Sequence, residues 1–290
     1  MTQRPARTAK RPPSMTALRP RSMLFTLFGD YAHPRRRDVQ LAGLVHAGEA
    51  LGLSEAAVRS AVARLAREGW IVSRRAGGRS RYGLSVSGRS LIEEGTQRIY
   101  ERRSRAWDGA WCMLTYTIPE SKRAERDRIR RQLAWLGFGA MGGGTYVSAR
   151  DVAPETIALL RKRGVHSYAR VFSAKLVGPG EQADLVYQCW DLKDVAARYD
   201  AFVRHYEPLY KRDAALQRKG DLEDSQAFVT RFALTHDFRR FPFIDPDLPP
   251  RLLPAEWPGT RAQAIFRAHN RLLRAGAFRF FDAIARPDFA

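Results

Sequence analysis

The chain has 290 residues, 44% of them hydrophobic and 11% aromatic, which is enough for two or three domains with packed cores. Its formal net charge of +20 predicts a polyanionic partner, and nucleic acid is favoured over a membrane surface because no amphipathic helix has an aromatic face. Two cysteines without Cys-x-x-Cys spacing argue against a disulfide framework or a zinc knuckle, and no apolar run approaches the roughly 20 residues of a membrane span, so we expect a cytoplasmic protein.

The positive charge is concentrated at the front of the chain. Residues 1–20 contain no acidic residue and are rich in Arg, Pro, Thr and Ala, a composition that predicts a disordered basic arm. The arginines of this arm could reach into a minor groove, or they could simply add charge. Residues 22–32 carry apolar side chains at helical spacing, which predicts a first helix.

Residues 41–69 have the pattern of two helices separated by a turn. Ser54 is placed to cap the second helix, and the glycines at 52 and 69 allow left-handed helix ends. At about 100° per residue, Val58, Val62 and Leu65 share one face of the second helix, with Ala61 at its edge. The opposite face carries Arg59, Ser60, Ala63 and Arg67. We therefore expect a helix that is anchored on one side and cationic on the other.

Two strands, at residues 71–75 and 81–85, follow this helix and flank a glycine-containing tip at 76–80. Helix, turn, helix and basic ribbon in this order predict a winged helix-turn-helix domain over residues 21–105. Its trailing helix at 86–104 is either a dimer element or a spacer. The residues expected to contact DNA are Arg59, Ser60, Arg64 and Arg67 in the major groove, and Arg74, Arg79 and Arg81 on the ribbon. An ordinary solvated helix face, or a winged domain used for protein contacts, is the alternative.

The middle of the chain, residues 110–177, alternates strands and helices. Strands are predicted at 111–118, 145–148 and 167–173, with helices at 122–136 and 154–163. This β-α-β-α-β order indicates a small ferredoxin-like α+β domain. The three glycines at 142–144 are interpreted as a turn and not as a phosphate-binding loop, because no Gly-Lys-Ser/Thr follows them.

The last part of the chain, residues 183–290, is predicted to be a mostly helical domain, reached through a linker that contains Gly178-Pro179-Gly180. Helices are expected at 185–210, 222–239 and 261–284. Prolines are too frequent at 241–259 for a helix, so this stretch should be an ordered crossing loop pinned by aromatic side chains.

Several motifs in the chain resemble those of a known family, the PaaX-type repressors that regulate phenylacetate catabolism. The resemblance rests on Leu65-Ala66-Arg67-Glu68-Gly69-Trp70, Trp107-Asp108-Gly109-Ala110-Trp111, Leu136-Gly137-Phe138, Asp245-Pro246-Asp247-Leu248-Pro249 and the stretch from Leu252 to Gly259. It implies a winged-helix domain, a middle domain similar to the CRISPR Cas2 fold and a helical C-terminal domain. It also implies a homodimer that represses at a double-stranded DNA operator and is released by an aryl-CoA thioester, with effector-binding residues unknown.

A metal-dependent nuclease related to Cas2 is the enzyme to weigh against a regulator. Such a nuclease needs an aspartate at the end of the first strand of the middle domain, where this chain has Thr117. The six histidines show no i, i+4 pair, and no Gly-x-Ser-x-Gly is present. We therefore expect no catalytic residues, no metal and no cofactor.

Overall fold

A computed structural model of the protein describes residues 17–35, 38–76, 79–100, 107–177 and 181–285. Four sequence predictions fall partly or wholly on other residues. They concern most of the basic arm, the tip of the ribbon, the end of the trailing helix and the glycine–proline linker.

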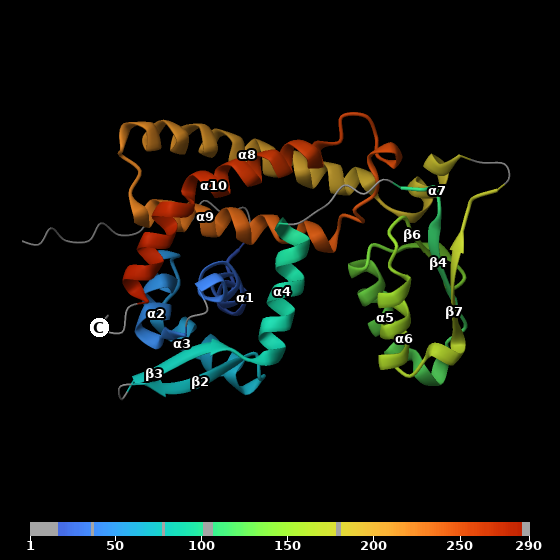
Figure 1. The fold of residues 1–290 in the computed structure, drawn as a ribbon, viewed down its shortest axis with the longest axis horizontal. Coiled ribbons are helices and arrows are strands. Elements are labelled where there is room, and N and C mark those ends of the chain that lie inside the picture. The colour runs from blue at the N-terminus through green and yellow to red at the C-terminus, as the bar shows by residue number, and fades with distance from the viewer. Residues whose placement is uncertain (1–16, 36–37, 77–78, 101–106, 178–180, 286–290) are drawn as a thin grey trace, which may run out of the picture. The chain divides into compact units, whose positions relative to one another are not determined.

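The chain forms two compact units, here called unit one and unit two (Figure 1). Unit one comprises Met1–Glu101, Phe202–Arg239 and Arg261–Ala290, and unit two comprises Arg102–Ala201 and Arg240–Thr260. Each unit has its own hydrophobic core. The winged-helix region predicted at 21–105 thus shares unit one with helices from the end of the chain.

Three helices and a π-helical turn open unit one. Helix α1 spans Pro20–Leu27 and continues as the turn η1 over Phe28–Ala32, where a single helix had been predicted at 22–32. Pro20 at the first helical position explains the early start, because its fixed φ suits a first turn. After the short turn η2 (His33–Arg35), the chain enters α2 (Leu41–Ala50) and α3 (Glu55–Arg67), close to the predicted bounds.

A small antiparallel sheet lies next to these helices. Its strands are β1 (Val39–Gln40), β2 (Ile71–Ala76) and β3 (Arg79–Leu84), in the order β1-β3-β2. The predicted ribbon is therefore present, and the short β1 adds a third strand that the sequence did not indicate. Helix α4 (Val86–Tyr100) follows the ribbon.

Helices from the end of the chain complete the core of unit one. They are α9 (Asp224–Phe238) and the parts of α8 (Leu192–Lys219) and α10 (Pro258–Ile284) that belong to this unit. Helix α1 packs against α9, and Met23 and Leu65 belong to the same buried cluster as Phe228 and Phe281. Burying apolar surface against α9 and α10 is therefore part of what stabilises the N-terminal helices.

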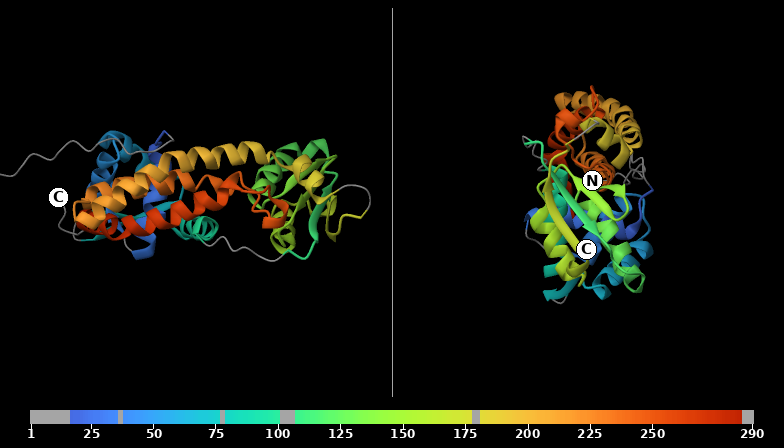
Figure 2. Two further views of the ribbon diagram at one scale, coloured as in Figure 1. Left: turned by 90° about the horizontal axis from the view of Figure 1, so that it is seen from above. Right: turned by 90° about the vertical axis from the view of Figure 1, so that its right-hand side faces the viewer.

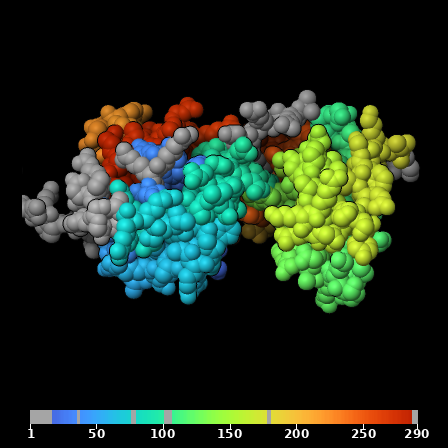
Figure 3. Space-filling view, turned by 60° about the horizontal axis from the view of Figure 1, so that its bottom comes forward, coloured from blue at the N-terminus to red at the C-terminus, as the bar shows by residue number. Residues whose placement is uncertain are grey.

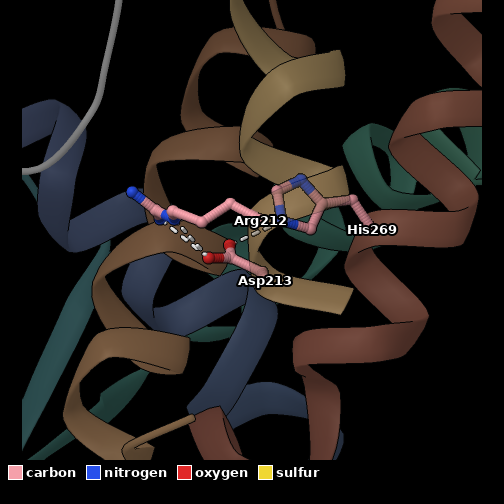
Figure 4. Close-up of polar contacts among 3 residues, drawn as sticks. All are labelled: Arg212, Asp213 and His269. Carbon is pink, nitrogen blue, oxygen red and sulfur yellow. Dashed lines mark hydrogen bonds and ion pairs between the residues drawn. The ribbon is translucent and has the colours of Figure 1, made fainter. Parts of the chain in front are cut away.

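Helices α8 and α10 run side by side (Figures 1 and 2) and are joined by a fully buried hydrogen bond. His269 Nε2 lies 2.9 Å from Asp213 Oδ2, and both side chains are 0% exposed. Because a carboxylate can only accept, Nε2 carries the proton in this contact. Arg212 donates from Nε and Nη2 to the other oxygen of Asp213, at 2.9 and 2.7 Å (Figure 4).

Unit two is built on a four-stranded antiparallel sheet with strand order β5-β6-β4-β7. The strands are β4 (Trp111–Tyr116), β5 (Gly139–Gly142), β6 (Thr145–Ser148) and β7 (Ala169–Ala174). Helices α5 (Arg123–Trp135) and α6 (Ala153–Lys162) lie on one face of the sheet, as Figure 1 shows. This is the predicted ferredoxin-like arrangement, with one strand, β5, that the sequence did not reveal.

The other face of this sheet is partly covered by α7 (Gln182–Cys189) and by the proline-rich segment at 241–257. As predicted, that segment crosses without an α-helix and forms only the short turns η5 (Phe241–Phe243) and η6 (Pro250–Leu252). Tyr199 pins it, because its ring stacks on Phe241 at 3.9 Å and its hydroxyl donates to Asp245 at 2.6 Å. Both cysteines lie in unit two as free thiols.

Candidate nucleic-acid interface

Helix α3 is fixed in unit one by its caps and by one apolar face. The hydroxyl of Ser54 accepts a hydrogen bond from the N–H of Ala57 at 3.3 Å, and Gly69 follows the helix with a φ of +75°. Its buried residues are Val58, Ala61, Val62 and Leu65, as the helical spacing predicted. The caps and the core face together determine which side of α3 meets solvent.

The solvent-facing side of α3 carries the four residues predicted to enter a major groove. Arg59, Ser60, Arg64 and Arg67 are all exposed. Arg59 donates to Glu55 one turn earlier, with an Nε–Oε1 distance of 2.6 Å. Arg64 and Arg67 have no ion-pair partner within the described part of the chain, so their charges are available to an external anion.

The end of α3 is tied to α1 by a further ion pair. Arg21 donates from Nη2 to Glu68 at 2.8 Å, and this hydrogen bond holds the pKa of the Glu68 carboxyl below its usual value. Arg21 also lies over the ring of Phe25, whose edge meets Trp70. These contacts hold the start of β2 beside the end of α3.

The ribbon places its arginines differently from α3. Strand pairing puts Arg74 directly opposite Arg81 on the face that points away from the core, while Tyr82 and Leu84 pack against the core. Arg74 donates to Asp38 at 2.6 Å, which offsets the repulsion between the two facing guanidinium groups. Gly83 makes room for this carboxylate, because a Cβ there would lie 1.9 Å from Asp38 Oδ1.

The three predicted ribbon residues therefore differ in how accessible they are. Arg74 is 53% exposed but already paired. Arg81 is half-buried, and its Nε has no hydrogen-bond partner among the described residues, so it is less accessible than the α3 arginines. Arg79 belongs to β3, but its side chain lies outside the described part of the structure. The sequence analysis did not identify Asp38 as a partner of the ribbon arginines. The one sequence feature that could have drawn attention to it is its position directly after three arginines.

A buried polar cluster fixes α4 next to this surface. Tyr100 at the end of α4 donates to Asp30 Oδ1 at 3.0 Å, and the guanidinium of Arg231 lies 3.7 Å from Asp30 Oδ2. Burial raises the pKa of the neighbouring Tyr31 to about 12, so this phenol stays protonated. Asp30 and Tyr31 lie on the π-helical turn η1, a form of helix that is rare and frequent at functional sites.

The accessible residues of α3, β2 and β3 belong to one continuous surface, light blue to cyan in Figure 3. A helix with small residues and guanidinium groups on its outer side can approach phosphates and base edges. Across the described residues, no three His, Cys, Asp or Glu side chains form a group that could hold a metal ion. Within the same residues, no helix is long and apolar enough to span a bilayer.

Comparison with known proteins decides the family. The PaaX-like protein model matches residues 19–88, the PaaX protein central Cas2-like domain matches 104–186, and the PaaX-like protein C-terminal domain matches 190–283. The chain is 33% identical over 250 residues to "Transcriptional repressor PaaX" of Escherichia coli (strain K12), covering 84% of this chain and 77% of that protein. The chain belongs to the PaaX family.

A solved structure has a similar fold. It is the uncharacterized protein Rv0674 from Mycobacterium tuberculosis, with a TM-score of 0.59 and 26% sequence identity. The similarity covers 92% of this chain and 99% of that one. The first region matched by the PaaX models contains α1 to β3, and hence the surface described above. The central match establishes the ferredoxin-like domain of unit two as Cas2-like.

Proposed function

We propose that this PaaX-family protein is a DNA-binding transcriptional repressor and not an enzyme. The observation that carries the proposal is the division of α3 between a buried apolar face and an exposed face with Arg59, Arg64 and Arg67. Next to it, β2 and β3 form a basic ribbon. We interpret these elements as a winged helix-turn-helix whose second helix would enter a major groove. The Escherichia coli relative is named a transcriptional repressor, which supports the same function.

We assign three regions to this function. Residues 21–105 bind the operator, residues 110–177 form the Cas2-like middle domain, and residues 183–290 form the helical C-terminal region. A Cas2-type nuclease is not favoured, because Thr117 follows β4 where a metal-binding aspartate would be needed. A repressor of this kind works in the cytoplasm as a homodimer, since one winged module has a modest contact area.

An in vitro selection from random DNA duplexes tests this function. The expected product is an inverted repeat, because a two-fold homodimer presents two copies of α3 to successive turns of one DNA face. Sedimentation at micromolar protein should show a dimer, both alone and with the selected duplex. Failure to enrich any sequence would contradict operator recognition, whereas a monomer in both samples would contradict only the homodimer.

The regulated genes and the effector follow from the family resemblance. We propose that the operator belongs to an aromatic-acid catabolic operon of the phenylacetate type, and that an acyl-CoA such as phenylacetyl-CoA releases the protein from it. For release to occur, the thioester must bind the DNA-free state more tightly, so thioester and operator weaken each other by the same factor. Four tryptophans in residues 111–290 offer aromatic surface for such a ligand, although Trp111 is buried in the core of unit two.

Phenylacetyl-CoA is expected to lower the affinity for the selected duplex and to stabilise the free protein against thermal unfolding. At about 100 times its Kd, a ligand that binds only the folded state adds roughly 2.7 kcal/mol to the free energy of unfolding. Free phenylacetate and unesterified CoA serve as matched controls. If the thioester changes neither signal at millimolar concentration, the effector is a different molecule and the assignment of DNA binding is unaffected.

A further inference from the structure

A pocket of about 410 Å³ opens in unit two at the end of β4. Helix α5 contributes Arg126 and Arg130, and the end of β5 with the turn that follows it contributes Gly142–Gly144. The pocket also contains the rings of Tyr116 and Tyr146. No Asp, Glu, His or Cys belongs to its lining, so it offers hydrogen-bond donors and positive charge but no ligand set for a metal ion. Its volume is that of a small-molecule site.

The two tyrosines form one wall of the pocket. Tyr116 is 7% exposed, and its ring stacks on that of Tyr146, with centroids 5.6 Å apart and an interplanar angle of 22°. Their hydroxyl oxygens are 3.1 Å apart, so one phenol donates to the other. Burial raises the pKa of Tyr116 well above its usual value, and the hydroxyl therefore remains a donor. The second phenolic proton has no acceptor within the described part of the chain, and a ligand oxygen in the pocket would supply one.

The cations come from one face of α5. Arg126 and Arg130 are one helical turn apart, so their side chains project on the same side. Arg126 donates from Nη2 to Glu120 at 2.8 Å and is 27% exposed. Arg130 is exposed and has no ion pair or hydrogen bond within the described ranges. Both guanidinium groups line the same pocket as the two phenols.

A run of three glycines forms another part of the rim. Gly142, Gly143 and Gly144 have φ values of +100°, +57° and +79°, a region that other residues rarely adopt. The N–H of Tyr116 donates to Gly144 O at 3.0 Å, and a Cβ on Gly144 would lie 2.4 Å from Tyr116 O. Next to Gly142 and Gly143 the space is open. Glycine is thus required by the backbone, and it leaves the mouth of the pocket open to a ligand.

We propose that this pocket binds a small phosphate-bearing molecule. Two guanidinium groups and a phenolic donor match the charge and the acceptor oxygens of a phosphate or diphosphate, and the stacked rings give the remainder of the ligand a flat surface. The recognition comes from side chains and does not use the backbone cradle of a Gly-Lys-Ser/Thr loop. The site lies in the Cas2-like domain and does not depend on the proposed operator binding.

Calorimetric titration of the full-length protein with inorganic pyrophosphate tests the proposal. The wild type is expected to bind saturably in the micromolar to millimolar range. Removing Arg130 or Arg126 (Arg130→Ala, Arg126→Ala) should weaken binding by about tenfold or more, because each deletes a charge-assisted hydrogen bond. Tyr146→Phe removes a hydroxyl but keeps the ring stack, and should weaken binding by a smaller factor. Glu120→Gln should tighten binding severalfold, because it releases Arg126 and removes a negative charge.

Arg128→Ala is the matched control, since Arg128 is a half-exposed arginine on the same helix that does not line the pocket. It should bind pyrophosphate as the wild type does, and equal unfolding temperatures would show that the variants are folded. The proposal is overturned if the wild type shows no saturable binding up to about 10 mM. It is overturned as well if the Arg126→Ala/Arg130→Ala variant binds normally.

The arginines of α3, which we propose contact the phosphates of DNA, are a second place where pyrophosphate can bind. An Arg64→Ala/Arg67→Ala variant distinguishes the two sources, because it should lose operator affinity and keep pyrophosphate binding. If this variant loses pyrophosphate binding while the pocket variants keep it, pyrophosphate binds at α3 and the proposal is overturned. Normal operator binding by the pocket variants would show that the two sites act separately.

Discussion

Replacing Arg67 of α3 with alanine is expected to weaken operator binding by about 1 to 3 kcal/mol, which corresponds to roughly 5- to 150-fold in Kd. Arg67 is exposed in the last turn of the helix and has no ion pair in the described regions, so its full charge is available to DNA. Arg64→Ala should behave similarly. If either residue reads a base, sequence preference relaxes; if it contacts a phosphate, affinity falls evenly and the salt slope flattens by about one.

Arg59 should behave differently because it is already paired with Glu55. Contact with DNA must disrupt or share that pair, so Arg59→Ala should cost less than Arg67→Ala. By the same argument Glu55→Gln should strengthen operator binding, since it removes a carboxylate near the phosphates and releases the guanidinium. Fluorescence anisotropy with the selected duplex at several salt concentrations measures all four variants.

Arg218→Ala is the control for these measurements, because Arg218 is an exposed arginine of unit one on α8, far from α3 in sequence. It should change neither affinity nor salt slope. Unchanged affinity and salt slope in all three α3 arginine variants would show that DNA does not bind the exposed face of α3. An alanine variant of Arg79 then becomes the next test, because that residue borders the tip of the ribbon.

The parts of the fold that the sequence predicted well depend on local signals. Ser54 marks the start of α3 through its side-chain hydroxyl, and Gly69 marks the end through its positive φ. The 3.6-residue period places Val58 on the buried face and Arg59 on the exposed face. The ferredoxin-like domain of unit two was predicted in the same way, from alternating strand and helix patterns. In each of these cases, the information lies within a few residues of the feature that it determines.

Strand β5 shows why other parts could not be predicted. Its sequence, Gly-Ala-Met-Gly, has low strand propensity, and it becomes a strand because it pairs with β6. Gly139 is required because a Cβ there would lie 2.5 Å from the ring of Trp190, which is distant in the sequence. Neither the pairing nor the close approach leaves a local pattern. The same holds for Asp38, whose role depends on a strand that follows much later.

The candidate DNA-binding surface likewise has features that the local sequence predicted and features that depend on distant residues. The exposure of Arg59, Ser60, Arg64 and Arg67 follows from the helical period, and the structure brings these four residues to one face. The half-burial of Arg81 does not follow from its neighbours, because it depends on β1 pairing with β3. Similarly, the core shared by α1, α9 and α10 depends on apolar faces that lie more than half the chain apart.

The buried contact between α8 and α10 is the clearest long-range feature, since Asp213 and His269 are 56 residues apart. Asp213→Ala is expected to lower the free energy of unfolding by about 1 to 3 kcal/mol, the range for leaving a buried hydrogen-bond donor without an acceptor. Without the carboxylate, the His269 ring keeps two nitrogens in a fully buried site, and its Nδ1 already has no partner among the described residues. Urea unfolding followed by far-ultraviolet circular dichroism measures the change.

Glu207→Gln is the matched control, because Glu207 joins the same two helices through an ion pair with Arg261, which is 64% exposed. A solvent-exposed pair of this kind contributes about 0 to 1 kcal/mol. Asp213→Asn should fall between the two variants, since an amide oxygen still accepts one hydrogen bond. If Asp213→Ala is no more destabilising than Glu207→Gln, the buried pair does not hold α8 against α10. If Asp213→Ala is the more destabilising of the two, it should lower operator binding because part of the protein has an unfolded unit one. The molecules that remain folded should keep their sequence preference.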